Sequence, residues 1–474
     1  MIPITATDAA GLLAARLIGE ATTLLGPDVT IDSRTVVPGA LFAAIVGEHN
    51  DGHAYAPQAA ASGAAAVLVQ HEVAVAVPQL VVSDVVAALA TLARETVATA
   101  KAQGLKVLAL TGSSGKTSTK DMLAQIMELS GSTVSPVNSL NNATGMPLTA
   151  LRVVGDTKFL VSELGANHVG EIAGYTQVAP PDVAAVLNVG LAHLGEFGSR
   201  EHIAQAKGEI VAPLRPDDWA ILNAADPLVT AMAERTRARI GWFGDVNCEE
   251  PRSELWVGVR KQTADAFERP SFLLYGRTPT CHFEFPVTLR FAGAHMASNA
   301  AAAAAMALAA KVPPETVATG LNAARPRSRW RMELHRLNTG TLIINDAYNA
   351  NPISVQAAFS VIEKLRAERH RAGESVRVTA VLGDMLELGA ESAALHREVG
   401  RQAKAAGIDT VIAVGDYAAD VVAGAGTAVV ASKADVPGLL PYGAADVILL
   451  KGSHSVGLEA VADGLIAHFG EADV

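Results

Sequence analysis

The chain has 474 residues, of which half are hydrophobic and only 18% are charged, and its formal net charge is −11 at neutral pH. At roughly 100–200 residues per domain, this length predicts three domains or two large ones. The negative net charge argues against a nucleic-acid-binding protein, because such proteins usually carry a basic domain. It does not exclude an anionic small substrate, which a local basic site can hold on an acidic protein.

Cysteine content and hydropathy exclude further classes. The two cysteines, Cys248 and Cys281, provide neither a disulfide framework nor a paired-cysteine metal site. The first twenty residues lack the basic start and the unbroken apolar stretch of a secretory signal. The alanine-rich run at 300–310 is too short to span a bilayer. We therefore expect a cytoplasmic protein without membrane insertion, and we expect it to be a monomer.

The first block, residues 1–103, is predicted to be a small α/β domain. Short apolar runs at 40–46 and 64–69 are typical of strands, and the Ala/Val/Leu stretch at 85–100 favours a helix.

The second block, residues 104–326, is predicted to be a central α/β domain with a parallel sheet. Its apolar run at 106–111 indicates a buried strand, a glycine-rich turn follows, and 118–129 has helical periodicity. Strand candidates and helical patterns then alternate, as in mononucleotide-binding folds. The further strand candidates are 159–164, 183–189 and 219–223.

Two later segments differ from this alternation. The mixed stretch at 249–286 predicts an antiparallel excursion at the edge of the central domain, and the charged segment around 324–331 reads as a linker. A third block, residues 327–474, is predicted to be a Rossmann-like α/β domain. Its strand candidates are 341–345, 376–382, 410–414 and 446–450.

The strongest local signal is the turn Thr-Gly-Ser-Ser-Gly-Lys-Thr at 111–117. Glycines allow the backbone to wrap around phosphate oxygens, and a helix N-terminus supplies positive potential. Lys116 can neutralise the β- and γ-phosphates, and Thr117 can place its hydroxyl on Mg²⁺. Leu110 stands where the general pattern has glycine, so the loop is a variant. The candidate nucleotide-binding residues here are Thr111, Gly112, Ser113, Ser114, Gly115, Lys116, Thr117 and Ser118.

Three further polar residues are ambiguous when each is taken alone. Glu163 ends a strand candidate, where a carboxylate can point into the ligand crevice and bind Mg²⁺, or simply be exposed. A lone histidine such as His193 is more often a satisfied surface or core group. Lys207 has the pattern of a solvated helix lysine.

The loop resembles the nucleotide loop of the Mur ligase family, in which the missing glycine is normal, and the spacing of the three polar residues resembles its central domain. The resemblance implies that Glu163 and His193 bind Mg²⁺ at two sites. It also implies that Lys207 is carbamylated by CO₂, so that a cation becomes an anionic oxygen ligand beside the metal. Lys116, Lys207, His193 and Arg331 are accordingly the expected catalytic residues.

The third domain carries the most diagnostic stretch, Asp-Ala-Tyr-Asn-Ala-Asn-Pro at 346–352, although locally it reads as a turn. By resemblance, Arg331 and Asp346 contact the nucleotide when this domain closes. Asn299 matches the family's Gly-x-His-x-x-x-Asn pattern near adenine, although alone it reads as a helix N-cap. Resemblance places the side chains of Tyr348, Asn349 and Asn351 near the incoming substrate.

The first domain resembles the uridine-nucleotide domain of the later Mur ligases. Ser33 and Arg34 suit a diphosphate, although a turn with a surface arginine is the plain alternative. In the central domain, Asn141, Asn142 and Thr144 belong to a similar stretch that serves the muramoyl peptide or the dipeptide.

Taken together, the resemblance implies that the chain uses ATP to join D-alanyl-D-alanine to UDP-N-acetylmuramoyl-tripeptide. The three domains then become a UDP-substrate-binding, an ATP-binding and a ligase domain. A sibling ligase, such as the enzyme adding the third muramoyl residue or folylpolyglutamate synthetase, remains the nearest alternative. A non-catalytic nucleotide-binding subunit and a generic kinase or GTPase are the others; the metal-binding residues argue against the first and the glycine spacing against the second.

Overall fold

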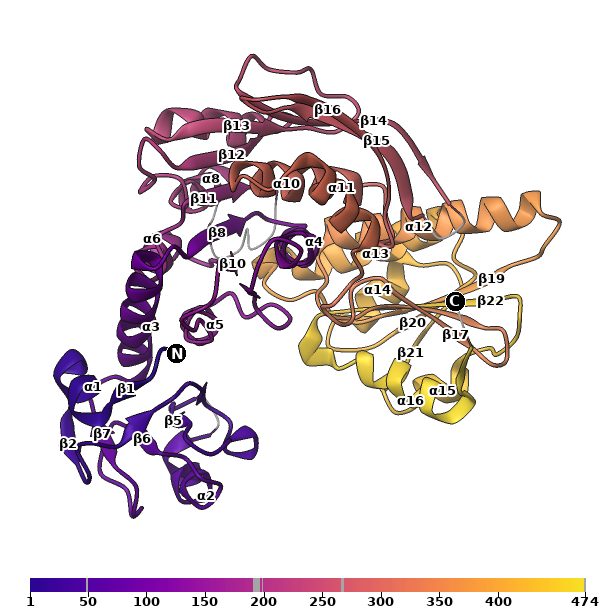
Figure 1. Cartoon of the computed structure of the whole chain (residues 1–474). Helices are drawn as coiled ribbons and strands as arrows, with labels where there is room; N and C mark the ends of the chain where they lie inside the picture. Colours follow the sequence, from indigo (N-terminus) through magenta and orange to yellow (C-terminus); the bar gives the residue numbers. More distant parts are fainter. Residues whose placement is uncertain (48–49, 191–196, 198, 266–267, 473–474) are drawn as a thin grey trace.

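The computed structural model describes residues 1–47, 50–190, 197, 199–265 and 268–472. The chain forms three α/β lobes, which we call the first, central and third lobes, each built around a sheet of its own (Figure 1). The three sheets fall within the three predicted domains, whose boundaries stay a prediction. Among the described helices, none is long and apolar enough to cross a bilayer.

The first lobe contains a five-stranded sheet in the order β2-β7-β6-β5-β4, in which only β2 runs antiparallel to its neighbour. The predicted strands at 40–46 and 64–69 are β5 and β6, both shorter than expected. The elements are β1 (Ile4–Thr5), α1 (Ala6–Leu13), β2 (Arg16–Ile18), β3 (Leu24–Leu25), β4 (Val29–Thr30), β5 (Leu41–Ala43), α2 (Ala56–Ala61), β6 (Ala66–Val69) and β7 (Gln79–Val81).

The long helix α3 (Val85–Ala102) joins the first lobe to the central lobe, and it confirms the helix predicted at 85–100. Asp84 caps it by accepting hydrogen bonds from Val86 N and Ala87 N. Its buried face packs against α1 on one side and against the central helices α5 and α6 on the other. One continuous apolar cluster therefore runs from the first lobe through α3 into the central lobe.

The central lobe contains a nine-stranded sheet in the order β16-β15-β14-β13-β12-β11-β8-β10-β9, parallel from β9 to β14 and antiparallel beyond. This confirms the parallel sheet and its antiparallel edge. The strands are β8 (Lys106–Thr111), β9 (Thr133–Val134), β10 (Phe159–Glu163), β11 (Val183–Val186), β12 (Trp219–Asn223), β13 (Arg239–Phe243), β14 (Leu255–Ala264), β15 (Pro270–Arg277) and β16 (His282–Thr288). The helices are α4 (Lys116–Glu128), α5 (Gly145–Ala150), α6 (Glu171–Val178), α8 (Arg200–Gly208), α9 (Pro227–Thr230), α10 (Met296–Ala309) and α11 (Pro314–Ala323).

Strand β11 ends three residues before the predicted end at Val189. Leu187 N still donates to Thr111 O of β8, but the chain then turns. Asn188 faces the glycine-rich loop, where its backbone oxygen accepts from Ser113 N (3.1 Å) and its Oδ1 accepts from Ser114 N (3.0 Å). The residues predicted to end the strand thus hold the glycine-rich loop instead.

The third lobe is a seven-stranded sheet in the order β21-β20-β19-β22-β18-β17-β23, with a parallel core from β21 to β18 and an antiparallel edge. This is the predicted Rossmann-like arrangement. Its strands are β17 (Glu333–Leu337), β18 (Leu342–Asp346), β19 (Arg377–Leu382), β20 (Thr410–Ala413), β21 (Ala428–Val430), β22 (Asp446–Lys451) and β23 (Glu471–Ala472). Its helices are α12 (Pro352–Arg371), α13 (Ser392–Ala405), α14 (Ala418–Gly424), α15 (Val436–Leu439) and α16 (Glu459–Phe469).

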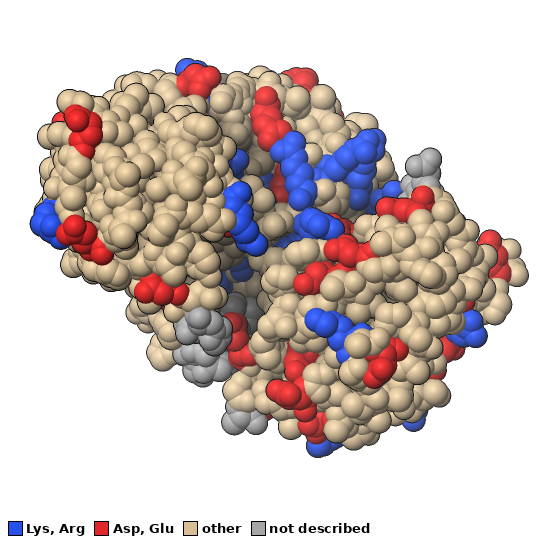
Figure 2. All heavy atoms as spheres, turned by 90° about the horizontal axis from the view of Figure 1, so that it is seen from below, with Lys and Arg blue, Asp and Glu red and all other residues tan. Residues whose placement is uncertain are grey.

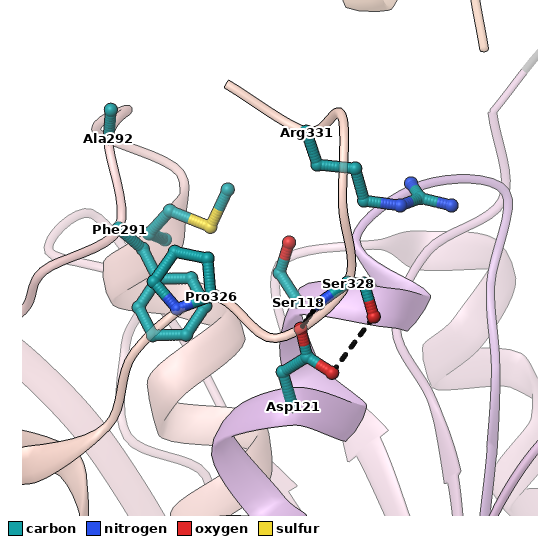
Figure 3. Close-up of a pocket in the computed structure, with 8 residues that line it drawn as sticks. Ser118, Asp121, Phe291, Ala292, Pro326, Ser328 and Arg331 are labelled. Carbon is teal, nitrogen blue, oxygen red and sulfur yellow. Dashed lines mark hydrogen bonds between the residues drawn. The ribbon is translucent and has the colours of Figure 1, made fainter. Parts of the chain in front are cut away.

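The segment between α11 and β17 has no helix or strand, as a linker should, yet it is anchored along α4. Ser328 N donates to Asp121 Oδ2 at 2.9 Å, and Ser328 Oγ donates to Asp121 Oδ1 at 3.0 Å (Figure 3). Arg327 N also donates to Asp121 Oδ2, at 3.0 Å. Asp121 pairs with Lys120, and both side chains are buried. The helix that follows the glycine-rich loop therefore also fixes the start of the third lobe.

Candidate active site

A cleft of about 760 Å³ lies between the central and third lobes. Its walls come from the glycine-rich loop, the ends of β10 and β18, the start of α10, and the linker. Seen from below, the surface is hollowed between two lobes, and lysine and arginine side chains gather at that hollow (Figure 2). An open α/β sheet binds ligands at this edge, beyond the carboxyl ends of its strands.

The glycine-rich loop leads directly from β8 into α4. Gly115 adopts φ +78°, and a Cβ there would lie 2.6 Å from Asn299 Oδ1, so glycine is needed for both conformation and space. Asn299 lies inside α10 and not at its cap, which is His295; the N-cap interpretation is therefore wrong. Within the loop, Thr111 and Gly112 are buried and do not line the cleft, whereas the residues from Ser113 to Ser118 do.

Lys116 is the first residue of α4 and lies on the cleft wall. Its Nζ donates to Gly112 O at 2.7 Å, which folds the side chain back over the loop. Burial lowers the pKa of Lys116 below its ordinary value, Glu163 opposes this shift, and Arg331 adds to it. The electrostatic influence of Glu163 and Arg331 on this amine indicates that the three groups share one site.

Glu163 ends β10 with its side chain buried and facing the cleft. Its Oε1 accepts hydrogen bonds from Thr117 Oγ1 (3.1 Å) and Asn141 Nδ2 (2.8 Å). Its Oε2 is buried and has no hydrogen-bond partner within the described part of the chain. A buried carboxylate oxygen without a partner is costly, and a hard cation such as Mg²⁺ would satisfy it. The residues therefore fit a cation held by Glu163 and Thr117.

Lys207 is buried in α8 (2% exposed), so its interpretation as a solvated helix lysine is wrong. Burial, with a further contribution from the Lys116 charge, lowers the pKa of Lys207 well below its ordinary value. A lowered pKa favours the neutral amine, and the neutral amine is the form that reacts with CO₂. Lys207 is not among the residues lining the cleft, and His193 lies outside the described residues.

Arg331 and Asp346 reach the cleft from the linker and from the end of β18. Arg331 Nη2 donates to Ser139 Oγ at 2.8 Å. Asp346 Oδ1 accepts from Met332 N (3.2 Å), and its Oδ2 accepts from the buried Lys451 Nζ (2.6 Å). Sequence reasoning assigned no role to Ser139, which lies in the same stretch as Asn141, or to Lys451, the last residue of β22.

The remaining third-lobe candidates line the cleft but differ in what their side chains do. The Tyr348 ring lies against Arg331, with 4.1 Å from its centroid to the guanidinium carbon. Asn349 is exposed, and its Oδ1 accepts from Ala350 N. Asn351 is the N-cap of α12, and its Oδ1 accepts from Ser354 N at 2.9 Å in a capping box.

Asn141, Asn142 and Thr144 also line the cleft. Asn141 supports Glu163 as described above, and Asn142 Oδ1 accepts from Gly145 N at 2.8 Å at the start of α5. Thr144 precedes α5 without a side-chain capping bond.

Ser33 and Arg34 are not among the residues of this cleft. Ser33 Oγ donates to Gln58 Oε1 at 2.9 Å, and Arg34 is exposed and paired with Asp32. The Arg34 hydrogen bonds lower the pKa of Asp32 to about 2.

Comparison with known families covers most of the chain. Residues 110–307 match the Mur ligase middle domain, 330–454 match the Mur ligase glutamate ligase domain, and 28–129 match the Mur ligase family catalytic domain. Together with the three-lobed α/β fold and its cleft, these matches identify a ligase. The chain belongs to the Mur ligase family.

Two relatives within that family are enzymes of the same name. The UDP-N-acetylmuramoyl-tripeptide–D-alanyl-D-alanine ligase of Escherichia coli is 37% identical over 470 residues, covering 98% of this chain and 99% of that protein. The enzyme of the same name from Mycobacterium tuberculosis is 37% identical over 488 residues, covering 93% and 92%.

Solved structures agree with this placement. A crystal structure of MurF from Acinetobacter baumannii has a TM-score of 0.82 and 32% identity, and covers 98% of this chain and 99% of that one. The MurF ligase from Thermotoga maritima in complex with ADP has a TM-score of 0.73 and 25% identity, and covers 93% and 97%.

Proposed function

We propose that the protein is an ATP-dependent ligase that joins D-alanyl-D-alanine to the terminal carboxylate of UDP-N-acetylmuramoyl-tripeptide. The observation that carries the proposal is the convergence of Lys116, Glu163, Arg331 and Asp346 from two lobes on one cleft. The names of the relatives support the choice of substrates, and the ADP complex of the Thermotoga maritima structure supports ATP as the phosphoryl donor.

The reaction requires activation because forming an amide from a carboxylate in water is uphill. The γ-phosphate of ATP is transferred to the tripeptide carboxylate, giving ADP and an acyl phosphate. The amine of D-alanyl-D-alanine then attacks the acyl carbon, and the tetrahedral intermediate expels inorganic phosphate as the amide forms. A cleft between two lobes suits this sequence, since closing it aligns two separately bound reactants and excludes water.

The chain's own residues provide most of the charge neutralisation. The backbone amides at 113–117 and the N-terminus of α4 bind phosphate oxygens, and Lys116 lies beside them. Arg331 approaches from the linker and adds a permanent positive charge to the wall of the cleft. We assign Asn299 and Asp346 to the nucleotide as well.

Mg²⁺ would be held at Thr117 and Glu163, with His193 and a carbamate on Lys207 at a second position. When bound, it would neutralise charge on the transferred phosphoryl group. The buried, unpartnered Oε2 of Glu163 supports the first position, and the lowered pKa of Lys207 supports the carbamate.

The substrates are assigned to two regions. Ser33 and Arg34 of the first lobe are proposed to contact the UDP portion. The residues nearest the peptide and dipeptide are Asn141, Asn142, Thr144, Tyr348, Asn349 and Asn351. We also propose a cytoplasmic location, because the reaction consumes ATP.

The test measures phosphate release from ATP and Mg²⁺ with UDP-N-acetylmuramoyl-tripeptide and D-alanyl-D-alanine, added singly and together. Release that requires both supports the proposal. Release with neither would indicate a simple ATPase, and release only with another UDP-peptide, or with folate and glutamate, would assign the chain to a sibling. Lys116→Ala is expected to abolish turnover in a folded protein, and normal ligation by this variant would refute the role of the loop.

A further inference from the structure

Arg331 is held from two sides, by a residue of each lobe. On the central side, its Nη2 donates to Ser139 Oγ at 2.8 Å. On the third-lobe side, its guanidinium carbon lies 4.1 Å from the centroid of the Tyr348 ring. Its Nε is buried and has no hydrogen-bond partner within the described residues, so it is available to an anionic ligand.

From Ser139, further hydrogen bonds lead to Glu163, the carboxylate proposed to bind the metal. A guanidinium only donates, so Ser139 Oγ accepts from Arg331 and its own proton is free to be donated to Thr117 Oγ1, 2.8 Å away. Thr117 Oγ1 in turn donates to Glu163 Oε1 at 3.1 Å, because an ionised carboxylate only accepts. A single chain of donors thus connects the linker to Thr117 and Glu163.

The Tyr348 ring is itself held in place by neighbouring residues. The Tyr348 ring stacks on His454 with 5.8 Å between centroids and 9° between planes, and His454 stacks on Trp330 at 5.0 Å and 29°. Tyr348 N also donates to Trp330 O at 3.0 Å. The ring that faces Arg331 is therefore fixed relative to the linker that carries Arg331.

We propose that Ser139 and Tyr348 are positioning residues that clamp Arg331, and that Ser139 transmits its position to Thr117 and Glu163. The inference rests on the proposed function, because it assigns Arg331 to the phosphoryl-transfer site. In this arrangement the ring of Tyr348, and not its hydroxyl, supports the Arg331 guanidinium. Through this clamp, the positions of the Thr117 and Glu163 side chains depend on whether the third lobe is in place.

The first experiment compares matched substitutions on each side of the clamp. Ser139→Ala and Tyr348→Leu are expected to lower kcat/KM for ATP by about 5- to 30-fold, the loss that one cation–π contact or one charged hydrogen bond represents. Ser139→Thr and Tyr348→Phe keep the hydroxyl and the ring, so they should retain most of the activity. Ser360→Ala removes an exposed hydroxyl on α12 and serves as the control.

The second experiment is a double-mutant cycle with Arg331→Met, measured as ADP·Mg²⁺ affinity by calorimetry and therefore without turnover. If Ser139 and Tyr348 act through Arg331, Ser139→Ala and Tyr348→Leu should weaken binding in the native background and add nothing to Arg331→Met. Additive losses, or no loss in the native background, would overturn the clamp. So would a Tyr348→Phe variant as impaired as Tyr348→Leu.

The two proposals fail in different ways. A native enzyme that releases no phosphate with the tripeptide and dipeptide contradicts the proposed function, whereas the affinity cycle still decides whether the clamp exists. Thermal unfolding of each variant separates loss of the clamp from loss of the fold.

Discussion

Removing the carboxylate of Asp121 is expected to release the linker from α4. This side chain is 3% exposed and accepts hydrogen bonds from Arg327 N, Ser328 N and Ser328 Oγ, besides pairing with Lys120. A hydrogen bond to a charged group contributes about 1.5–3 kcal/mol, so the two backbone bonds contribute about 3 kcal/mol at the lower end. At about 1.4 kcal/mol per factor of ten, opening of the linker should rise by about two orders of magnitude in Asp121→Ala.

Limited trypsin digestion measures this opening directly. The linker offers cleavage after Arg327, Arg329 and Arg331, while Pro326 protects the bond after Arg325. When opening and closing are faster than cleavage, the cleavage rate follows the population of the open linker. Mass spectrometry of the first fragments, followed over time, gives the rate at these three sites.

Two further variants make the result specific. Asp121→Ala also leaves Lys120 buried without its partner, which costs about 3–5 kcal/mol, so Asp121→Asn is the milder substitution if the first fails to fold. Glu128→Gln removes an exposed partner of Arg327 worth about 1 kcal/mol or less, and should change cleavage only several-fold. Equal cleavage of folded Asp121→Ala and Glu128→Gln would refute the reasoning.

Three other predictions concern the rest of the molecule. Lys207→Ala should lose activity and regain part of it with short carboxylates, and a fully active variant would exclude the carbamate. Lys364 of α12 donates to the buried Glu268 of the central lobe at 2.8 Å. Lys364→Ala should therefore raise hydrogen exchange in α12, and unchanged exchange would mean that this pair does not hold the lobes together. The carboxylates of Glu333 and Glu471, which lie 3.7 and 2.7 Å from the His335 ring nitrogens, raise the pKa of His335 above its ordinary 6.5. Its stabilisation is therefore full below that pH and lost as pH rises through the higher folded value, so His335→Gln should lower Tm more at acidic than at alkaline pH.

Local patterns predicted the central sheet and its loop well. Strand β8 and strand β12 have the predicted bounds, because each is a short apolar run between clear turn signals. The glycine-rich loop was equally predictable, since the positive φ at position 115 requires a glycine. The early end of β11 was not readable, because Asn188 leaves the strand to bond a loop more than seventy residues earlier in the chain.

Features that depend on packing between distant segments were predicted poorly. Lys207 has the sequence of a solvated lysine, and only the fold buries it. Ser139 was assigned no role, since its hydrogen bond depends on Arg331 arriving from far along the chain. The linker's composition predicted a linker, but not that Asp121 holds its backbone in place.

The two joints of the molecule differ in chemical character. Through α3, the first and central lobes share a continuous apolar cluster, whereas the described contacts of Asp121 and Glu268 with the linker and α12 are ionic and hydrogen-bonded. Excluded salts such as sulfate strengthen apolar burial, while ionic strength screens exposed charge pairs. An excluded salt should therefore strengthen the apolar joint through α3, whereas the polar joint should respond much less to ionic strength, because its carboxylates, Asp121 and Glu268, are buried.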